Sequence, residues 1–350
     1  MLYNLICIDF IMKTKIIALL IMVLVFFDLF LGFRIKKPDD KIVQPPAQGL
    51  PVLYVENNTI RRADNHERAQ LKGVSTMAFA YEDYPISAFI GIAEKVKLWN
   101  INLLGLFIQP DIVENKTEEL DEIINWAEKN YIYIYLMPRA SDQMDLSNQL
   151  IRFPSMMSQL AKNYAKKNHI IYGFWAEPNM EWGEWYKLAD QIAKEIVREK
   201  PDALMLLTGI NFGRSFDLNR TFPYKNIILD FHDYPASDIN SLQSVLAKDE
   251  IDFLWKNAKQ TYPILVGEFG GVWQYGFGSR EDLIYIQKLL DEINKNGLSY
   301  SAYTIDNHNN DDNDVEEGLG LINWYTGLPT KKGGLIRQDL LNYPPTDFSK

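Results

Sequence analysis

Cysteine is almost absent from this sequence of 350 residues, since Cys7 is the single one. No disulfide bridge can form within the chain, and no metal site can be built from several thiolates. Histidine is scarce too, and His66 and His169 show no metal-ligand spacing, so zinc chemistry is not indicated. Lys and Arg total 36 against 46 for Asp and Glu, and the net charge of −10 disfavours a nucleic-acid partner.

The glycine pattern G-x-G-x-x-G is also missing after the first predicted strand, which argues against a dinucleotide-binding fold. Apolar residues are plentiful, because 47% of the chain is hydrophobic and 13% is aromatic. This composition excludes a disordered, collagen-like or coiled-coil protein as the main architecture. The length allows two ordinary domains or one large α/β barrel.

Residues 1–37 contain an apolar run from Ile16 to Phe33, interrupted by Asp28, near the lower length limit for a membrane-spanning helix. Lys13 and Lys15 precede this run, as in the charged start of a signal sequence, so translation could begin at Met1 or at Met12. We predict a signal or transmembrane anchor in residues 1–37. An uncleaved anchor, a cleaved signal and a buried soluble helix stay open as alternatives.

Residues 38–51 are rich in proline and are predicted to form an extended linker. The folded domain is then expected at residues 52–350, and it begins with a hairpin, because Asn57 and Asn58 tolerate the positive φ of a tight turn. Eight short apolar runs without polar alternation follow, as expected for strands buried on both faces, at 71–77, 102–108, 131–137, 170–175, 203–209, 226–231, 263–268 and 299–304. Helical patterns alternate with them, including 117–129, 185–199 and 279–296. The sequence therefore predicts an α/β fold, a (β/α)8 TIM barrel.

Polar residues at the ends of the predicted strands are candidates for a functional site, since barrel sites lie at the carboxyl ends of the strands. Glu177 follows strand four and Glu268 ends strand seven, so both carboxylates are expected in one mouth. Two facing carboxylates can cleave an acetal, because one protonates the leaving oxygen and the other meets the oxocarbenium-like carbon. A gap of about 5–5.5 Å would retain the anomeric configuration, whereas about 6.5–9.5 Å would admit water and invert it.

Five segments, in this order, resemble glycoside hydrolase family 5, a cellulase-like family of clan A retaining glycosidases. They are Leu71-Lys72-Gly73-Val74, Trp175-Ala176-Glu177-Pro178, His232-x-Tyr234, Gly267-Glu268-Phe269-Gly270 and Gly318-Leu319-Gly320-Leu321-Ile322-Asn323-Trp324. The resemblance, which covers about residues 52–342, implies that Glu177 is the general acid/base and Glu268 the nucleophile. It also implies that His232 and Tyr234 position the sugar and hold the nucleophile's carboxylate. No cofactor is expected.

The chain departs from the family pattern at several positions of the usual site. Ala176 stands where the family has an Asn before its acid/base, and Gly105 falls where it has an Arg on strand two. The usual His of strand three is replaced near Pro138, and residues 303–305 lie where a Trp is expected. Because lost transition-state hydrogen bonds weaken catalysis, a carbohydrate-binding pseudoenzyme on the same barrel is the alternative. An envelope-associated interaction platform and a transglycosylase are further rivals.

Aromatic residues near the acidic strand ends are candidates for stacking on sugar rings. We predict that Trp175 and Trp273 bind substrate, and that Trp185 packs in the core. The expected partners are an oligosaccharide or polysaccharide and, through the N-terminal helix, a membrane, and the protein is expected to be a monomer. The catalytic domain is expected outside the cytoplasm, either membrane-anchored or secreted. The sequence leaves the glycan and its linkage open.

Overall fold

The computed structural model describes six stretches of the chain, namely residues 49–80, 86–140, 146–270, 279–305, 320–323 and 327–350. All of them belong to the unit formed by residues 45–350. The predicted anchor and almost all of the predicted linker lie outside the described residues, so the boundaries at 37 and 51 stay predictions. Among the helices that the structure describes, none combines the length and apolarity needed to cross a bilayer.

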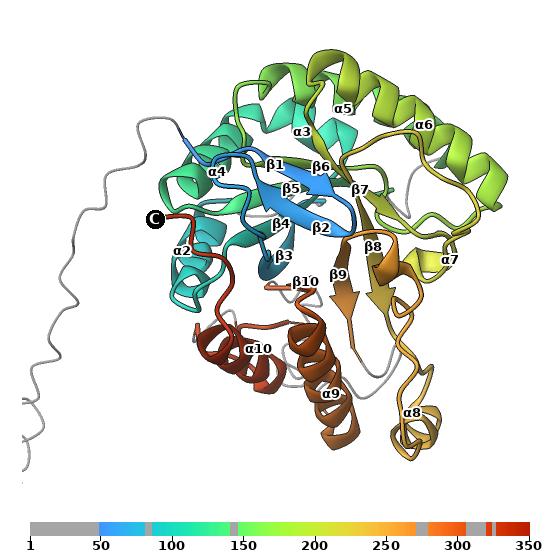
Figure 1. Cartoon of the computed structure of the whole chain (residues 1–350). Coiled ribbons are helices and arrows are strands. Elements are labelled where there is room, and N and C mark those ends of the chain that lie inside the picture. The colour runs from blue at the N-terminus through green and yellow to red at the C-terminus, as the bar shows by residue number, and fades with distance from the viewer. Residues whose placement is uncertain (1–48, 81–85, 141–145, 271–278, 306–319, 324–326) are drawn as a thin grey trace, which may run out of the picture. The chain divides into compact units, whose positions relative to one another are not determined.

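Eight parallel strands close into a barrel, which confirms the predicted fold (Figure 1). Each strand pairs with the next along the chain, and β10 pairs with β3 to close the ring. Every predicted strand overlaps an observed one. The barrel strands are β3 (Lys72–Phe79), β4 (Leu103–Ile108), β5 (Tyr133–Pro138), β6 (Ile170–Gly173), β7 (Leu204–Thr208), β8 (Ile227–Asp233), β9 (Ile264–Phe269) and β10 (Ser299–Ala302).

Helices cover the outside of the barrel between the strands (Figure 1). They are α2 (Ile86–Lys97), α3 (Pro110–Asn115), α4 (Thr117–Lys129), α5 (Leu146–Asn163), α6 (Trp182–Glu199), α7 (Ile210–Gly213), α8 (Ile239–Leu246), α9 (Arg280–Asn296) and α10 (Lys331–Asn342), with a short 3-10 helix at Ala258–Gln260. The predicted helix at 117–129 is confirmed as α4. Ser279 caps α9, since its side chain accepts a hydrogen bond from the Asp282 backbone N–H. The helix predicted from Trp185 begins earlier, at Trp182. Its start was not evident in the sequence, because Gly183 lowers the helix propensity of the first turn.

The barrel wall is packed on both faces, which explains why its strands are apolar without alternation. Leu104 and Ile134 face the outer layer of helices, whereas Leu103, Tyr133 and Tyr135 fill the interior. Each strand therefore contributes alternate side chains to two cores.

The predicted hairpin is confirmed as β1 (Leu53–Glu56) paired with β2 (Thr59–Arg62), and Asn57 in its turn has a φ of 56°. Ile60 of the hairpin lies around the same interior space as Leu71 and Ile228, near the amino ends of their strands. Figure 1 shows the hairpin across this end of the barrel. The hairpin thus covers the amino end and leaves the carboxyl end for a site.

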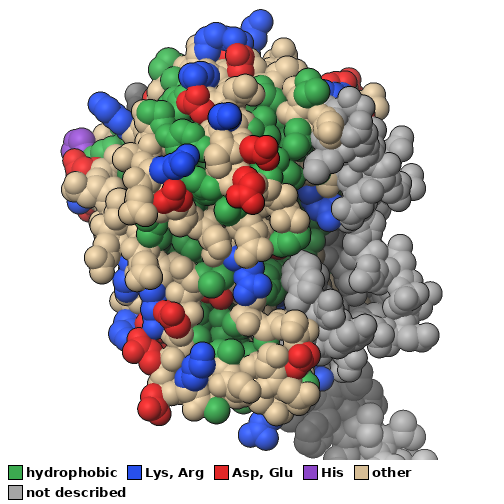
Figure 2. Space-filling model, turned by 90° about the vertical axis from the view of Figure 1, so that its right-hand side faces the viewer, with side chains coloured by type: hydrophobic (Ala, Val, Ile, Leu, Met, Phe, Trp, Pro, Cys, Tyr) green, Lys and Arg blue, Asp and Glu red, His purple; other side chains and the backbone are tan. Residues whose placement is uncertain are grey.

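One face of the molecule, shown in Figure 2, carries acidic and basic side chains that are interspersed. The described residues of this face form no large patch of a single sign. A phosphate backbone would need a continuous basic surface, which this face does not provide.

Gly73→Ala should destabilise the barrel strongly, because a Cβ at this position of β3 would lie 1.7 Å from the Leu103 carbonyl oxygen on β4. We expect the free energy of unfolding to fall by about 3 kcal/mol or more. Gly91→Ala is the matched control, since a Cβ there meets nothing within 4 Å and α2 should gain about 0.5–1 kcal/mol. Urea unfolding followed by circular dichroism measures both changes, and equal stabilities would contradict this packing.

Candidate active site

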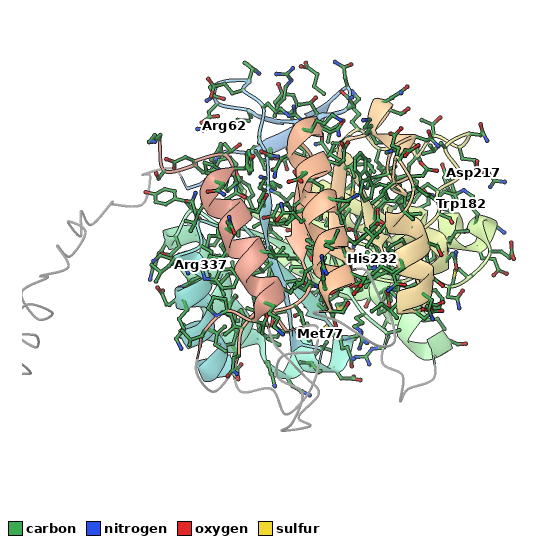
Figure 3. All side chains as sticks on the ribbon, turned by 90° about the horizontal axis from the view of Figure 1, so that it is seen from below. Arg62, Met77, Trp182, Asp217, His232 and Arg337 are labelled. Carbon is green, nitrogen blue, oxygen red and sulfur yellow. The ribbon has the colours of Figure 1, made fainter. Side chains whose placement is uncertain are left out.

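The polar strand ends meet at the carboxyl end of the barrel. Glu268 and His232 lie near the ends of β9 and β8, and Glu177 follows β6. One oxygen of each glutamate and one ring nitrogen of His232 all lie within 4.8 Å of one another. In Figure 3, His232 and Met77 of β3 lie away from Arg62 of the hairpin, so this cluster lies at the end of the barrel opposite the hairpin.

His232 lies between the two glutamates and a third carboxylate. Its Nδ1 is 3.3 Å from Oε1 of Glu177 and 3.6 Å from Oε2 of Glu268. Its Nε2 is 3.4 Å from Oδ2 of Asp230. Glu268 and Asp230 are buried, while Glu177 is partly exposed. The facing glutamate oxygens, within 4.8 Å, match the short separation at which one carboxylate can attack directly.

Burial and neighbouring charges set the protonation of this cluster. Burial opposes a charged His232, but the charge of Glu268 and the hydrogen bonds to Asp230 and Glu177 raise the pKa of His232 well above its ordinary value. Burial raises the pKa of Glu268 to about 8, although the charge of His232 reduces this effect. Burial also acts on Glu177, but the hydrogen bond and charge of His232 lower its pKa. His232 and burial thus separate the pKa values of the two glutamates, with that of Glu268 raised and that of Glu177 lowered.

Arg139 is a cation of the site that the sequence analysis did not select. It directly follows β5, and its charge lowers the pKa of both Glu177 and Glu268. The sequence held a signal for it, because a lone basic residue at the end of a buried strand points toward the mouth of a barrel. The glutamates therefore have a nearby guanidinium although strand two carries glycine at position 105.

Gly105 and Tyr135 form a packed pair on β4 and β5. A Cβ at Gly105 would lie 2.1 Å from Cζ of Tyr135, whose hydroxyl donates a hydrogen bond to Oγ of Ser301 at 3.1 Å. The ring of Tyr135 thus occupies the space that a longer side chain at position 105 would need. This explains how the barrel accommodates the departure from the family pattern.

Ala176 and Trp175 point to opposite sides of the barrel wall. Ala176 packs with the interior side chains, and its backbone N–H donates to the Pro138 carbonyl at 2.8 Å. Trp175 is 4% exposed, and its ring packs edge-on against Phe153 and Trp185 in the helix layer. The prediction that Trp175 binds substrate is therefore wrong, because adjacent residues of an extended chain face opposite sides.

Trp185 is fully buried, and its indole N–H donates to the Thr208 carbonyl at 2.9 Å, which confirms its predicted packing role. Tyr234 is buried, and burial followed by the charge of Glu268 raises the pKa of its hydroxyl well above the usual value. A protonated phenol beside Glu268 fits the predicted contact with the nucleophile, which stays a prediction. Trp273 lies outside the described residues.

Lys332 is a second cation that the sequence analysis did not select. It is 2% exposed, and its Nζ donates to the carbonyls of Phe269 at 3.0 Å and Tyr303 at 2.8 Å. Burial lowers the pKa of Lys332 to about 8, against the charges of Asp282 and Glu268. It ties the strand end that carries Glu268 to the chain after β10. A lysine in the first turn of a helix interacts unfavourably with the helix dipole. The unusual place of Lys332 in the first turn of α10 is therefore the feature of the sequence that could have identified it.

The spacing of Glu177, His232 and Glu268 also meets the distance condition for metal ligands. Nδ1 of His232 faces Oε1 of Glu177 at 3.3 Å, a distance at which the two side chains can hydrogen-bond to each other. The charge of Arg139 further disfavours a cation here. We therefore interpret the cluster as an acid–base site.

A family model for cellulases, glycosyl hydrolase family 5, matches residues 62–309. This match covers most of the chain and confirms the resemblance, so the chain belongs to glycosyl hydrolase family 5 and is a glycoside hydrolase by family. A search among curated protein sequences found no match.

Solved structures of similar fold include a β-glucanase from Saccharophagus degradans in complex with cellotetraose, with 19% identity, a TM-score of 0.67 and coverage of 84% of this chain and 94% of that one. The catalytic domain of a Thermobifida fusca endoglucanase has 19% identity, a TM-score of 0.64 and coverage of 83% and 97%. That of the major endoglucanase from Xanthomonas campestris pv. campestris has 14% identity, a TM-score of 0.65 and coverage of 83% and 99%. These likenesses show the shared barrel fold.

Lys332→Met should destabilise the domain, because it removes the donor from two buried carbonyls and the positive charge on which Asp282 acts. We expect the free energy of unfolding to fall by about 3 kcal/mol. Lys288→Met on the exposed side of α9 is the matched control and should change it by no more than about 0.5 kcal/mol. Urea titrations compare the two, and a Lys332 variant as stable as its control would show that the tie contributes nothing.

Proposed function

We propose that the protein hydrolyses a β-glycosidic bond by a two-glutamate retaining mechanism. The observation that carries this proposal is the facing pair, with oxygens of Glu177 and Glu268 within 4.8 Å of one another beside His232. Membership of a cellulase family supports hydrolysis of a glycoside. The mechanism needs one carboxyl as acid and one carboxylate as nucleophile, which a singly protonated pair supplies.

In the first step, Glu177 gives its proton to the leaving oxygen while a carboxylate oxygen of Glu268 bonds to the anomeric carbon. The glycosidic C–O bond breaks, and a covalent glycosyl–enzyme intermediate remains. In the second step, Glu177 takes a proton from a water molecule, whose oxygen attacks the same carbon and releases Glu268. Two inversions retain the configuration, and both glutamates return to their starting forms.

The raised pKa of Glu268 and the lowered pKa of Glu177 favour a proton on Glu268 in the free protein, whereas the first step needs one on Glu177. Both forms contain the same number of protons, so only a redistribution is required. Nδ1 of His232 lies beside both carboxylates and offers a route, in which the ring gives its proton to Glu177 and takes one from Glu268. We expect a bound glycosidic oxygen to favour the form with the proton on Glu177, because that proton can then donate to it.

We further propose that the substrate is a β-linked glucan or its oligosaccharides. Support comes from the structurally similar β-glucanase and from a Thermobifida fusca endoglucanase variant, both solved in complex with cellotetraose. The side chain of Ala176 lacks the amide group with which the usual Asn binds a sugar hydroxyl. This difference favours a second candidate, a catalytically impaired carbohydrate-binding protein on the same barrel. Both candidates bind the glycan, but only the first hydrolyses it.

We also propose that the barrel works outside the cytoplasm, either tethered to a membrane or secreted. The apolar run from Ile16 to Phe33 and the proline-rich residues 38–51 support this location. The run and nearly all of the proline-rich segment lie outside the described residues.

Glu268→Gln should abolish turnover, because an amide cannot form the glycosyl–enzyme bond, while the near-isosteric change leaves the fold intact. We expect kcat to fall by about 10⁴-fold or more with a nearly unchanged melting temperature. Glu118→Gln on the exposed side of α4 is the matched control. Release of reducing sugar from β-glucans and aryl β-glycosides measures turnover, and calorimetry with cellotetraose measures binding. Binding without turnover in the unaltered protein would favour the impaired protein, and full activity of the Glu268→Gln variant would refute the assignment.

The first product formed from a β-glycoside should have the β configuration. The nearest oxygens of the two glutamates lie within 4.8 Å, which is shorter than the gap of about 6.5–9.5 Å that admits a water molecule in inverting enzymes. Proton NMR of a reaction run for seconds to minutes, before mutarotation, distinguishes the two anomers. An initial α-anomer would mean inversion and would remove Glu268 as nucleophile.

A further inference from the structure

Asp230 is a buried carboxylate that the proposed mechanism does not use. It is 2% exposed and precedes His232 by two residues on β8. Its Oδ2 lies 3.4 Å from Nε2 of His232 and accepts a hydrogen bond from Oγ1 of Thr208 at 2.9 Å. A buried carboxylate is costly unless it is paired, and the imidazole is the partner that lies directly in front of it.

Two glycines leave the space that Asp230 and His232 fill. A Cβ at Gly267, next to Glu268 in the chain, would lie 2.1 Å from Oδ1 of Asp230. A Cβ at Gly213 would lie 2.6 Å from Cγ of His232. Larger residues at either position would displace the carboxylate or the ring, so the packing on both sides fixes this pair.

The turn after β7 brings Gly213 onto the imidazole. Asn211, Phe212 and Gly213 have φ values of 56°, 58° and 75°. Residues other than glycine rarely adopt this left-handed region, so the surroundings must hold the turn in place. The backbone of this turn therefore packs against one side of the His232 ring.

We propose that Asp230 is a positioning residue, which holds Nε2 of His232 so that a protonated Nδ1 faces both Glu177 and Glu268. This inference rests on the proposed function for its catalytic consequence. A carboxylate on the far nitrogen fixes the orientation of an imidazole and stabilises its charged form. The pair thereby supplies a fixed positive charge where the two glutamates meet.

Three carboxyl groups act on His232, namely Glu177 after β6, Asp230 on β8 and Glu268 on β9. The other charged groups of the site are Arg139 after β5, which acts on both glutamates, Asp233 on β8, and Asp282 of α9 with Lys332 of α10. Removing the charge of Asp230 takes away one of the three negative neighbours of His232, so His232 should then lose its proton more readily.

Asp230→Asn tests this role in the full chain, without substrate. The sequence has only four histidines, so NMR of imidazole-labelled protein can follow each ring, and His232→Gln identifies the signal of His232. In the wild-type protein we expect His232 to stay protonated well above the pH at which an ordinary histidine titrates. In Asp230→Asn the titration should move down by about one pH unit or more.

Asp233→Asn is the matched control, because Asp233 is a buried carboxylate of the same strand that accepts hydrogen bonds from the Tyr285 hydroxyl and the Leu254 backbone N–H. It should leave the His232 titration unchanged. Thr208→Val removes the hydroxyl that bonds Asp230, and it should shift the titration less and in the same direction as Asp230→Asn. This milder variant keeps the test available if Asp230→Asn does not fold.

Activity supplies an independent measurement on β-glycosides. The alkaline limb of the kcat/KM profile of Asp230→Asn should move to lower pH, with kcat reduced about tenfold or more and KM changed by less than about threefold. A His232 that is neutral in the wild-type protein at pH 7, or a titration that is unchanged in Asp230→Asn, would overturn the role of Asp230. If the titration shifts as expected in a protein that hydrolyses no glycoside, the positioning role stands and the proposed hydrolase function fails.

Discussion

Three carboxylates lie within 3.3–3.6 Å of the two nitrogens of one imidazole at the carboxyl end of this barrel. Such a group of buried acids is stable only if cations and protons offset their repulsion, and His232 with Arg139 provides this. The same charges shift the pKa values of the two glutamates in opposite directions, and acid and nucleophilic roles both depend on such a difference. Stability of the buried site and readiness for chemistry therefore depend on one set of charges.

The packing of the barrel strands determines where the side chains of the site can lie. Strands filled on both faces give each position a fixed side, so Ala176 and the interior tyrosines line the barrel while Trp175 joins the helices. Glycines then decide which large neighbours are allowed: Gly105 admits the ring of Tyr135, and Gly267 admits the carboxylate of Asp230. The departure from the family pattern at Gly105 is thus part of a consistent packing arrangement.

The barrel, the hairpin and the convergence of Glu177 with Glu268 could be predicted, because apolar runs, turn residues and strand-end acids are local signals. The error at Trp175 arose because residue type alone does not say which face of the chain a ring occupies. The contributions of Arg139, Asp230 and Lys332 depend on contacts between elements far apart in sequence, such as Nζ of Lys332 with the Phe269 carbonyl. Protonation could not be predicted either, since it follows from burial and distance.

Lys332 belongs to α10, which follows all eight barrel strands in the chain, yet it secures the carbonyl of the residue after Glu268. During synthesis on the ribosome, the strand carrying Glu268 emerges before the lysine that ties it down. Until α10 has been made and has docked, the Phe269 carbonyl lacks the buried donor that it has in the folded domain. The polar contacts at this strand end can thus form only late in the synthesis of the domain.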